Sequence, residues 1–282
     1  MASDKPARRA VVTGASSGIG AEYAAALARR GWDLVLVARR ADRLDALAGR
    51  LREGCGAGVE PLVADLARSP DLARVAERVT ADDVSLLVNN AGINGYGPFT
   101  EVDPALLAKV LEVNVVAPTV LTRVALPGMV ARGRGAVVNV ASLLAFAGSL
   151  PPGTLPHRAV YGGTKGYMVT FTRTLAAELA DSPVRVQVVC PGLTATEFHL
   201  GTGEAPVGGE ARVHEDGGMP PADVVAASLA GLETGEVLCV PGLSDPGPLT
   251  GLAEAELALR NGSGAVLADR YRAADARAGE PQ

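Results

Sequence analysis

Short, almost continuously apolar runs alternate with longer segments through most of the chain. The runs cover residues 9–13, 33–38, 59–63, 84–88, 135–140, 184–189 and 236–240. Apolar runs of this length, bounded by polar or glycine-containing segments, are typical of buried β-strands. Strands that alternate with helix-length segments indicate parallel pairing through right-handed crossovers. We therefore predict an α/β fold: a Rossmann-type, doubly wound, parallel seven-stranded sheet in a single domain.

The intervening segments predict helices, whose limits are set by glycine and proline. We expect helices over residues 21–30, 41–52, 71–79, 104–132, 161–180, 220–232 and 251–259. Gly31 ends the first helix, and Pro118 is expected to kink the long fourth one. The domain is expected to occupy residues 8–260, after an N-terminal tail of residues 1–7 and before a charged, alanine-rich extension at 261–282.

A glycine-containing turn joins the first predicted strand to the first predicted helix. Residues 13–20 read TGASSGIG, with glycines at 14, 18 and 20. In a strand–turn–helix unit, backbone N–H groups and the helix N-terminus can bind a phosphate. The spacing differs from the common G-x-G-x-x-G pattern, and a tight turn without a ligand is the alternative. We favour a dinucleotide phosphate at this turn.

Two arginines follow the second predicted strand, where the adenosine ribose of a dinucleotide would lie. An acidic residue there would accept from both ribose hydroxyls, but the chain has Arg39 and Arg40 after Ala38. Guanidinium groups match a 2′-phosphate, to which the Ser17 hydroxyl could add a contact. The sequence therefore favours NADP (NADPH) over NAD, the alternative being solvated charges that open the next helix. Asp65, after the third strand, could accept from an adenine amino group or cap the following helix.

Tyr161 and Lys165 supply the candidate chemistry. Residues four apart in a helix share one face, and a nearby ammonium lowers the pKa of a phenol from its usual value of roughly 10. Such a pair can act as a general acid or base, although a solvated helix face explains the spacing alone. Ser142 lies just past the fifth strand. Asn114 interrupts an apolar run, where it is either structural or part of a proton relay.

The composition limits the partners. The chain has 282 residues, a formal net charge of −5 and 20% charged residues, which disfavours nucleic acid. Cys55, Cys190 and Cys239 form no closely spaced pair, so we interpret them as reduced residues of a cytoplasmic protein rather than metal ligands. No uninterrupted apolar run approaches the roughly 18 residues of a membrane span, and no secretory signal is evident. We expect a cytoplasmic protein with no metal, nucleic-acid or membrane partner.

Together these motifs resemble the short-chain dehydrogenase/reductase (SDR) family of ordinary length. The matching segments, in the family's order, are TGASSGIG at 13–20, NNAG at 89–92, Asn114, Ser142, Tyr161 with Lys165, and PGLTAT at 191–196. The resemblance implies an NAD(P)-dependent oxidoreductase that interconverts a carbonyl and a secondary alcohol on a small-molecule substrate. It also implies a homodimer or homotetramer, assembled through the long helices at 104–132 and 161–180.

The resemblance implies a role for each catalytic residue. Tyr161 exchanges a proton with the substrate oxygen, while Lys165 lowers the Tyr161 pKa and binds the nicotinamide ribose. Ser142 donates to the substrate oxygen, Asn114 holds a water that links Lys165 to solvent, and the cofactor carries the hydride. Besides Arg39, Arg40, Tyr161 and Lys165, the residues implied in cofactor binding are Gly14, Ser16, Ser17, Gly18, Ile19, Gly20, Asp65, Leu66, Asn90, Gly92, Pro191, Gly192, Thr194 and Thr196.

The chain departs from the family between Ser142 and Tyr161, which lie 19 positions apart, farther than is usual. The excess, at 147–158, is rich in proline and glycine, and we expect a loop beside the active site, with His157 as a solvated side chain. The region 194–220 is expected to close over the substrate. The expected pocket walls favour an apolar substrate, because they contain Tyr96, Phe99, Phe146, Leu150 and Phe198.

Three alternatives stay open from the sequence. The enzyme could use NAD, or it could catalyse a non-redox reaction on the same fold, such as dehydration, cyclisation or epimerisation. It could also be a nucleotide-binding regulatory module without catalysis, against which the intact set of Ser142, Tyr161 and Lys165 argues. The sequence does not fix the substrate or the physiological direction.

Overall fold

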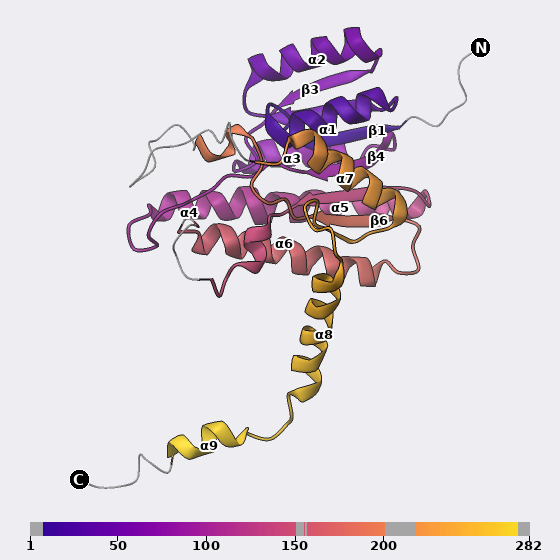
Figure 1. Ribbon diagram of the computed structural model, residues 1–282. Helices are drawn as coiled ribbons and strands as arrows, with labels where there is room; N and C mark the ends of the chain where they lie inside the picture. The colour runs from indigo at the N-terminus through magenta and orange to yellow at the C-terminus, as the bar shows by residue number, and fades with distance from the viewer. Residues whose placement is uncertain (1–7, 151–154, 156, 201–217, 276–282) are drawn as a thin grey trace. The chain divides into compact units, whose positions relative to one another are not determined.

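The strands form one parallel sheet. The computed structural model describes residues 8–150, 155, 157–200 and 218–275. In that part of the chain, seven strands pair in the order β3-β2-β1-β4-β5-β6-β7, each parallel to its neighbours (Figure 1). They are β1 (Arg9–Thr13), β2 (Asp33–Ala38), β3 (Val59–Val63), β4 (Val84–Asn89), β5 (Ala136–Val140), β6 (Arg185–Val189) and β7 (Leu238–Cys239). The predicted Rossmann-type, seven-stranded sheet is confirmed.

The strand order places a switch point between β1 and β4. The chain moves outward from β1 to β3 and then returns to the other side of β1 with β4. In open α/β sheets, ligands bind outside the carboxyl ends of the strands at such a point. The two strand ends are joined here, because the backbone N–H groups of Asn90 and Ala91 both donate to Thr13 Oγ1 at 3.0 Å.

Helices cover both faces of the sheet. The helices between residues 8 and 242 are α1 (Gly18–Arg29), α2 (Ala41–Cys55), α3 (Ser69–Val79), α4 (Pro104–Leu111), α5 (Ala117–Ala131), α6 (Ala159–Glu178) and α7 (Pro221–Thr234). Successive side chains of a strand point to opposite faces. Ala10 and Val12 of β1 therefore pack with α1, α2 and α7, whereas Val11 packs with α3 and α5.

The predicted long helix over 104–132 is interrupted by a π-helical turn rather than by a kink at Pro118. Residues Glu112–Val116 form this turn between α4 and α5, and the Ala117 N–H donates to the carbonyl of Glu112, five residues back. Pro118 has no N–H to donate, and it lies two positions after Val116, the last residue of this wider turn. The helical run thus continues through Pro118, and its interruption lies at the π-helical turn.

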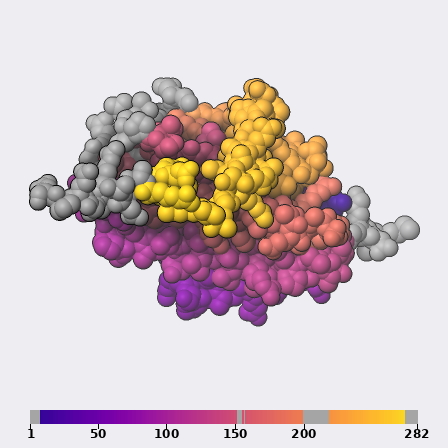
Figure 2. All heavy atoms as spheres, turned by 90° about the horizontal axis from the view of Figure 1, so that it is seen from below, coloured from indigo at the N-terminus to yellow at the C-terminus, as the bar shows by residue number. Residues whose placement is uncertain are grey.

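The combined run Pro104–Ala131 is the one helix among the described residues that is long and apolar enough to cross a membrane, judged by length and composition only. Core helices of soluble proteins pass the same test, and 39% of its most apolar window is buried. Residues of α4, α5 and α6 (magenta to salmon) form a broad part of the surface in Figure 2. Exposed apolar residues on these helices and the π-turn are Leu111, Val116, Val130 and Tyr167.

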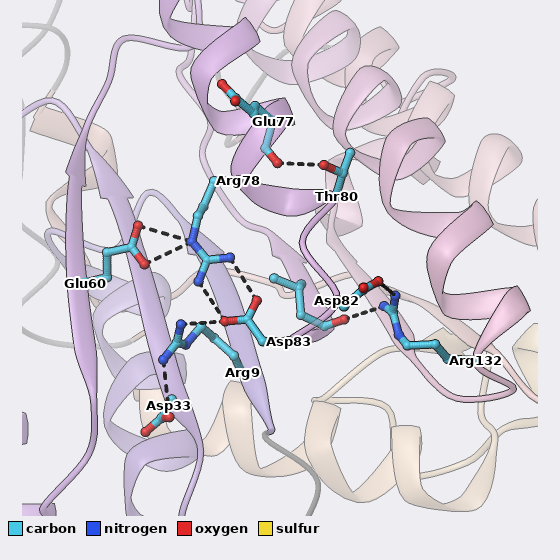
Figure 3. A network of polar contacts seen from close by, with 10 residues as sticks. Arg9, Asp33, Glu60, Glu77, Arg78, Thr80, Asp82, Asp83 and Arg132 are labelled. Atoms are coloured by element: carbon cyan, nitrogen blue, oxygen red, sulfur yellow. Dashed lines mark hydrogen bonds and ion pairs between the residues drawn. The ribbon is translucent and has the colours of Figure 1, made fainter.

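Ion pairs join the amino ends of the strands (Figure 3). The Arg78 guanidinium, on α3, donates to both Glu60 Oε1 and Oε2 through Nε, and to both carboxylate oxygens of Asp83 at 3.0 and 3.1 Å. Arg9, at the start of β1, pairs with Asp83 at 2.5 Å and with Asp33 at 3.4 Å. The amino edge of four adjacent strands, β3, β2, β1 and β4, is thereby linked by charge.

The sheet-containing unit ends earlier than predicted. The chain divides into two compact units, Met1–Gly242 and Leu243–Gln282, so the division precedes the expected domain end at residue 260. The second unit contains α8 (Gly247–Gly262) and α9 (Asp269–Asp275), and α9 was not anticipated from the sequence. None of the α8 residues is buried.

Candidate active site

Tyr161 and Lys165 lie together at the carboxyl edge of the sheet. Both are on α6 and both are buried, with 5% and 4% of their surfaces exposed. The Lys165 Nζ lies 5.5 Å from the centroid of the Tyr161 ring. It donates to the carbonyl oxygen of Val140, the last residue of β5, at 2.9 Å. The helix thus brings a phenol and an ammonium to the end of a central strand.

Ser142 is also at this site, despite its long separation from Tyr161 in sequence. Its side chain interacts with the Tyr161 phenol and lowers the pKa of that phenol. The same Oγ accepts from the Leu144 N–H at 3.1 Å and so caps a short 3₁₀ helix, Leu143–Phe146. The extra residues between Ser142 and Tyr161 therefore do not separate the two side chains.

The ends of the extra loop are fixed by Arg158. Its Nη2 donates to the carbonyl oxygens of Ala147 and Leu150, at 2.6 and 3.3 Å. His157 is exposed and contributes its backbone carbonyl, which accepts from the Gly97 N–H at 3.1 Å. Residues 151–154 and 156 of the predicted loop lie outside the described residues, as do residues 201–217 of the expected substrate region.

Burial dominates the titration of both catalytic candidates. It raises the pKa of Tyr161 well above the usual value, and nearby Tyr96 acts in the same direction, while the Ser142 side chain opposes them. Burial lowers the pKa of Lys165 to about 8. Removal of the phenol from water is the largest cause of the Tyr161 shift. The implied lowering of the Tyr161 pKa by Lys165, whose Nζ donates to the Val140 carbonyl, stays a prediction.

Asn114 lies in the π-helical turn and connects the site to α6. Its Nδ2 donates to the Ile93 carbonyl at 2.9 Å and to Thr164 Oγ1 at 3.1 Å, and its Oδ1 accepts from the Ile93 N–H at 3.0 Å. These bonds use both amide hydrogens and one lone pair of the carbonyl oxygen, which leaves one acceptor position. π-Turns within helices are frequent at functional sites. The proposed water at Asn114 remains a prediction.

The glycine turn is closely packed on both sides. A Cβ at Gly14, whose φ is +68°, would lie 2.9 Å from the Ala91 Cα, and one at Gly20 would lie 2.4 Å from the Gly14 carbonyl oxygen. Helix α1 begins at Gly18, earlier than predicted, so the helix N-terminus lies within the turn. Asn90 closes the turn by donating through Nδ2 to the Thr13 carbonyl at 2.9 Å.

Arg40 lies against this turn, whereas Arg39 is exposed. Arg40 Nη2 donates to Ser16 Oγ at 2.8 Å and to Ser17 Oγ at 2.7 Å. A guanidinium beside two hydroxyls at a helix N-terminus fits a phosphate group. The structure thus brings together only one of the two predicted arginines with the serines of the turn.

The remaining predicted cofactor residues lie around the same edge. Asp65 accepts from the Ala67 N–H at 3.1 Å, and its other oxygen lies 3.8 Å from Lys109 Nζ. It therefore closes a local turn and does not cap α3, which begins at Ser69 with Arg68 as its N-cap residue. Leu66 is buried. A Cβ at Gly92 would lie 3.6 Å from Lys165 Nζ.

The segment after β6 also borders the site. The Pro191 carbonyl accepts from the Leu143 N–H at 2.9 Å, and Thr194 Oγ1 donates to the Gly192 carbonyl at 3.1 Å. The Thr196 side chain lies against Gly18, where an added Cβ would meet it at 3.0 Å. Residues 191–196 therefore contact both Leu143, the neighbour of Ser142, and the glycine turn.

Two aromatic rings enclose the Tyr161 ring. Tyr96 packs against it edge-on, with 5.3 Å between ring centroids, and Phe198 lies 5.6 Å away on a tilted plane. Asn94 Nδ2 donates to the Phe198 carbonyl at 2.9 Å. The sequence placed Tyr96 and Phe198 in the pocket walls, and the structure puts both directly on the candidate acid. Phe99, another expected wall residue, is 63% exposed.

A family model described as short chain dehydrogenase matches residues 8–205. The chain belongs to this family. The comparison confirms the resemblance drawn from the motifs and the class of enzyme, an oxidoreductase.

Relatives span different shares of this chain. The very-long-chain 3-oxoacyl-CoA reductase of Anas platyrhynchos is 35% identical over 194 residues, which are 67% of this chain and 60% of that protein. A short-chain dehydrogenase from Sphingobium yanoikuyae, solved in complex with NADPH, has a TM-score of 0.85 at 37% identity and covers 94% of this chain and 100% of that chain. The bulky-bulky ketone specific alcohol dehydrogenase of Comamonas testosteroni has a TM-score of 0.83 at 31% identity, covering 95% and 99%.

Sequence reasoning missed several residues that shape the site. Thr13 ties β1 to β4, Thr164 holds Asn114, and Arg158 fixes the extra loop. Arg43 and Glu197 form an ion pair beside Arg40. Of these residues, only Arg43 could have been identified from the sequence. It follows Arg40 by three residues, and a helix brings such positions to one side. Among the described residues, no group of three His, Cys, Asp or Glu side chains could hold a metal ion.

Proposed function

We propose that this chain is an NADP(H)-dependent carbonyl reductase that converts a ketone of a small, apolar molecule into a secondary alcohol and can run the reverse reaction. One observation carries the proposal: a buried Tyr161 phenol, which interacts with the Ser142 side chain and lies one helical turn from Lys165, is at the carboxyl edge of the sheet, as is the glycine turn. A nicotinamide dinucleotide bound at this edge would supply or accept the hydride.

Tyr161 is the group that would exchange the proton with the substrate oxygen, in either direction of the reaction. A phenol whose pKa is raised by burial stays protonated at neutral pH. The protonated form is the one that can give a proton to a carbonyl oxygen, and oxidation would need the phenolate instead. Lys165 is charged below its pKa of about 8 and would stabilise the phenolate that remains. Ser142 would donate to the same substrate oxygen.

The preference for NADP is supported by Arg40. Its guanidinium lies on Ser16 and Ser17 at the ends of β1 and β2, where the adenosine ribose of a dinucleotide binds in this fold. A 2′-phosphate would gain charge-assisted hydrogen bonds from this guanidinium group, whereas a neutral 2′-hydroxyl would gain little from it. The NADPH complex of the Sphingobium relative agrees with this preference.

An apolar ketone is supported by the residues around Tyr161. Tyr96 and Phe198 face its ring, and the exposed side chains of Leu143, Phe146 and Leu193 follow β5 and β6. Apolar walls bury apolar substrate surface and give a polyanion nothing to pair with. The Comamonas relative is named for bulky-bulky ketones, and the Anas platyrhynchos relative for a very-long-chain 3-oxoacyl-CoA, of which the acyl chain is the apolar part.

The experiment that tests the proposal is a substrate panel. Purified protein is mixed with NADPH or NADH and with ketones of increasing apolar size, and the loss of absorbance of the reduced cofactor is followed. We expect turnover with NADPH and a rise of kcat/KM with apolar size. Turnover confined to phosphorylated sugars would overturn the substrate class, a preference for NADH would overturn the cofactor, and no redox turnover with any carbonyl would favour non-redox chemistry.

Self-association is part of the proposal. The exposed apolar residues Leu111, Val116, Val130 and Tyr167 lie on α4 to α6, the helices implied in a homodimer or homotetramer. Light scattering coupled to size exclusion measures the mass directly. A monomeric mass at micromolar protein concentration would contradict the proposed self-association.

A further inference from the structure

An intramolecular carboxylate lies at the predicted 2′-phosphate position. Glu197 begins a short 3₁₀ helix, Glu197–Leu200, that follows the PGLTAT segment. Its Oε2 accepts from Arg43 Nη1 at 2.7 Å and from Arg40 Nη1 at 3.2 Å. One carboxylate oxygen therefore bridges two guanidinium groups.

The donors of Arg40 are divided between two partners. Nε and Nη2 bind the hydroxyls of Ser16 and Ser17 on the glycine turn, and Nη1 is directed to Glu197. Arg43 lies one turn further along α2 and reaches the same oxygen. Two positive charges and two hydroxyls thus converge where one carboxylate provides a single negative charge. A phosphate monoester, with up to two negative charges and three oxygens, matches this set better.

We propose that Glu197 occupies the anion site of the cofactor's 2′-phosphate and competes with it, and that Arg43 is a ligand of that phosphate together with Arg40. This inference rests on the proposed use of NADP(H). Since both anions need the same guanidinium groups, the carboxylate weakens binding of a 2′-phosphorylated dinucleotide and leaves an unphosphorylated one unaffected. Glu197 is thus a residue that sets cofactor selectivity.

Phe198 connects Glu197 to the candidate catalytic residue Tyr161. This residue follows Glu197 directly, its ring packs on the Tyr161 ring, and its carbonyl accepts from Asn94. The 3₁₀ helix is therefore attached at two points, one on the arginines and one on Asn94. A phosphate that takes the arginines releases the first attachment and leaves the second.

The expected effect is moderate because the ion pair is partly solvated. The side chains of Arg40, Arg43 and Glu197 are 40%, 42% and 47% exposed, so water screens their attraction. Removal of the carboxylate charge should tighten binding of a 2′-phosphorylated ligand by about two- to fivefold. The effect should fall as salt is added.

The test measures dissociation constants by calorimetry rather than turnover. NADPH, NADH and adenosine 2′,5′-bisphosphate are titrated into the full chain and into Glu197→Gln and Arg43→Gln. We expect Glu197→Gln to tighten NADPH and the bisphosphate and to leave NADH unchanged. Arg43→Gln should weaken NADPH and the bisphosphate several-fold more than NADH. Thermal unfolding of each variant shows that it is folded.

A matched control removes a carboxylate nearby. Glu22, on α1, pairs with Arg29 at 2.9 Å and does not touch Arg40, so Glu22→Gln should leave all three constants unchanged. If Glu197→Gln leaves NADPH binding unchanged, or tightens NADH equally, the competition is absent although the use of NADP stands. If the unaltered chain binds NADH more tightly than NADPH, the proposed cofactor fails and this inference fails with it.

Discussion

A cation at the amino edge of the sheet, Arg78, and a buried cation at the carboxyl edge, Lys165, have opposite kinds of partners. At the amino edge, Arg78 is placed between Glu60 and Asp83, and Asp83 also binds Arg9 (Figure 3). At the carboxyl edge, the buried Lys165 ammonium has a backbone carbonyl as its hydrogen-bond acceptor and a phenol ring nearby. Opposite charges stabilise each other at the first edge. At the second edge, neither of these two partners of Lys165 is an anion. Such a buried ammonium contributes little to stability, but it can act on a reacting group nearby.

The pKa shifts at the two edges have opposite consequences for folding. Burial alone would raise the pKa of Asp83, but the hydrogen bond and charge of Arg78 and the charge of Arg9 lower it. Asp83 therefore stabilises the fold above the usual pKa of about 4, and this stability is lost as pH falls through the lower folded value. Lys165 is the reverse case. Its folded pKa of about 8 lies below the usual 10.5, so the folded chain binds fewer protons and stability rises with pH between these values.

The largest expected effect is on the rate when the carboxyl edge loses its acid. Tyr161→Phe removes the hydroxyl and keeps the ring that packs on Tyr96 and Phe198. We expect kcat for ketone reduction to fall by about 10²–10⁴, the usual contribution of a positioned acid. NADPH affinity and the midpoint of thermal unfolding should change little. A variant that keeps a tenth of the activity would show that another group provides the proton.

The next effect is on stability at the amino edge. Arg78→Gln leaves the carboxylates of Glu60 and Asp83 without their shared cation. The Arg78 side chain is 17% exposed, between the solvated and the buried limits, so we expect a loss of about 2 kcal/mol in the free energy of unfolding. Activity should be unchanged, because the edge is remote from the carboxyl ends.

Urea denaturation at two pH values checks the origin of that loss. At pH 7 the loss of stability in Arg78→Gln relative to the unaltered chain should be at its maximum. It should shrink as pH falls through the lowered pKa of Asp83 and this carboxylate takes up a proton. A difference that stays constant with pH would mean that Arg78 acts by packing alone. Arg74→Gln is the matched control, since Arg74 is 54% exposed and pairs within its own helix.

Much of the site could be predicted because its signals are local. The Tyr161–Lys165 spacing, the glycine turn and the strand ends are all set by neighbouring residues, and the family pattern adds their order. Seven apolar runs likewise predicted the sheet, which is confirmed. The assignment of roles to Asn114, Ser142, Tyr161 and Lys165 stays a prediction that activity measurements must test.

What the sequence did not reveal depends on contacts between distant residues. Glu197 reaches Arg43 across 154 positions, and no local pattern announces such a pair. The effect of Lys165 on Tyr161 was judged from spacing, whereas burial, which the fold creates, decides both pKa values. The π-turn was taken for a proline kink because both interrupt a helix near Pro118, and only backbone hydrogen bonds distinguish them.

A smaller effect is expected from Lys165→Met, and it has the opposite sign to that of Arg78→Gln. The pKa of Lys165 is about 8 in the folded chain and 10.5 in the unfolded chain. This difference corresponds to a destabilisation of the fold by about 3 kcal/mol at pH 7. The Val140 carbonyl would lose its donor, which costs about 1–2 kcal/mol. A net gain of about 1 kcal/mol in the free energy of unfolding should remain at pH 7 and disappear near pH 10, while reduction activity is lost. Destabilisation at pH 7 would show that the ammonium supports this edge after all.

The smallest expected effect separates true links at the amino edge from accidental ones. Arg132 donates to Asp82 at 3.0 Å and to the Val84 carbonyl at 2.9 Å, but the Asp82 side chain is 97% exposed. An exposed carboxylate gains little from a cation, because water solvates it equally well. Asp82→Ala should therefore leave the urea midpoint unchanged within error. Arg132→Ala should lower it, because the Val84 carbonyl then loses a donor. If both variants lowered it equally, ion pairing would matter along the whole edge, and exposure would not be what divides strong pairs from weak ones.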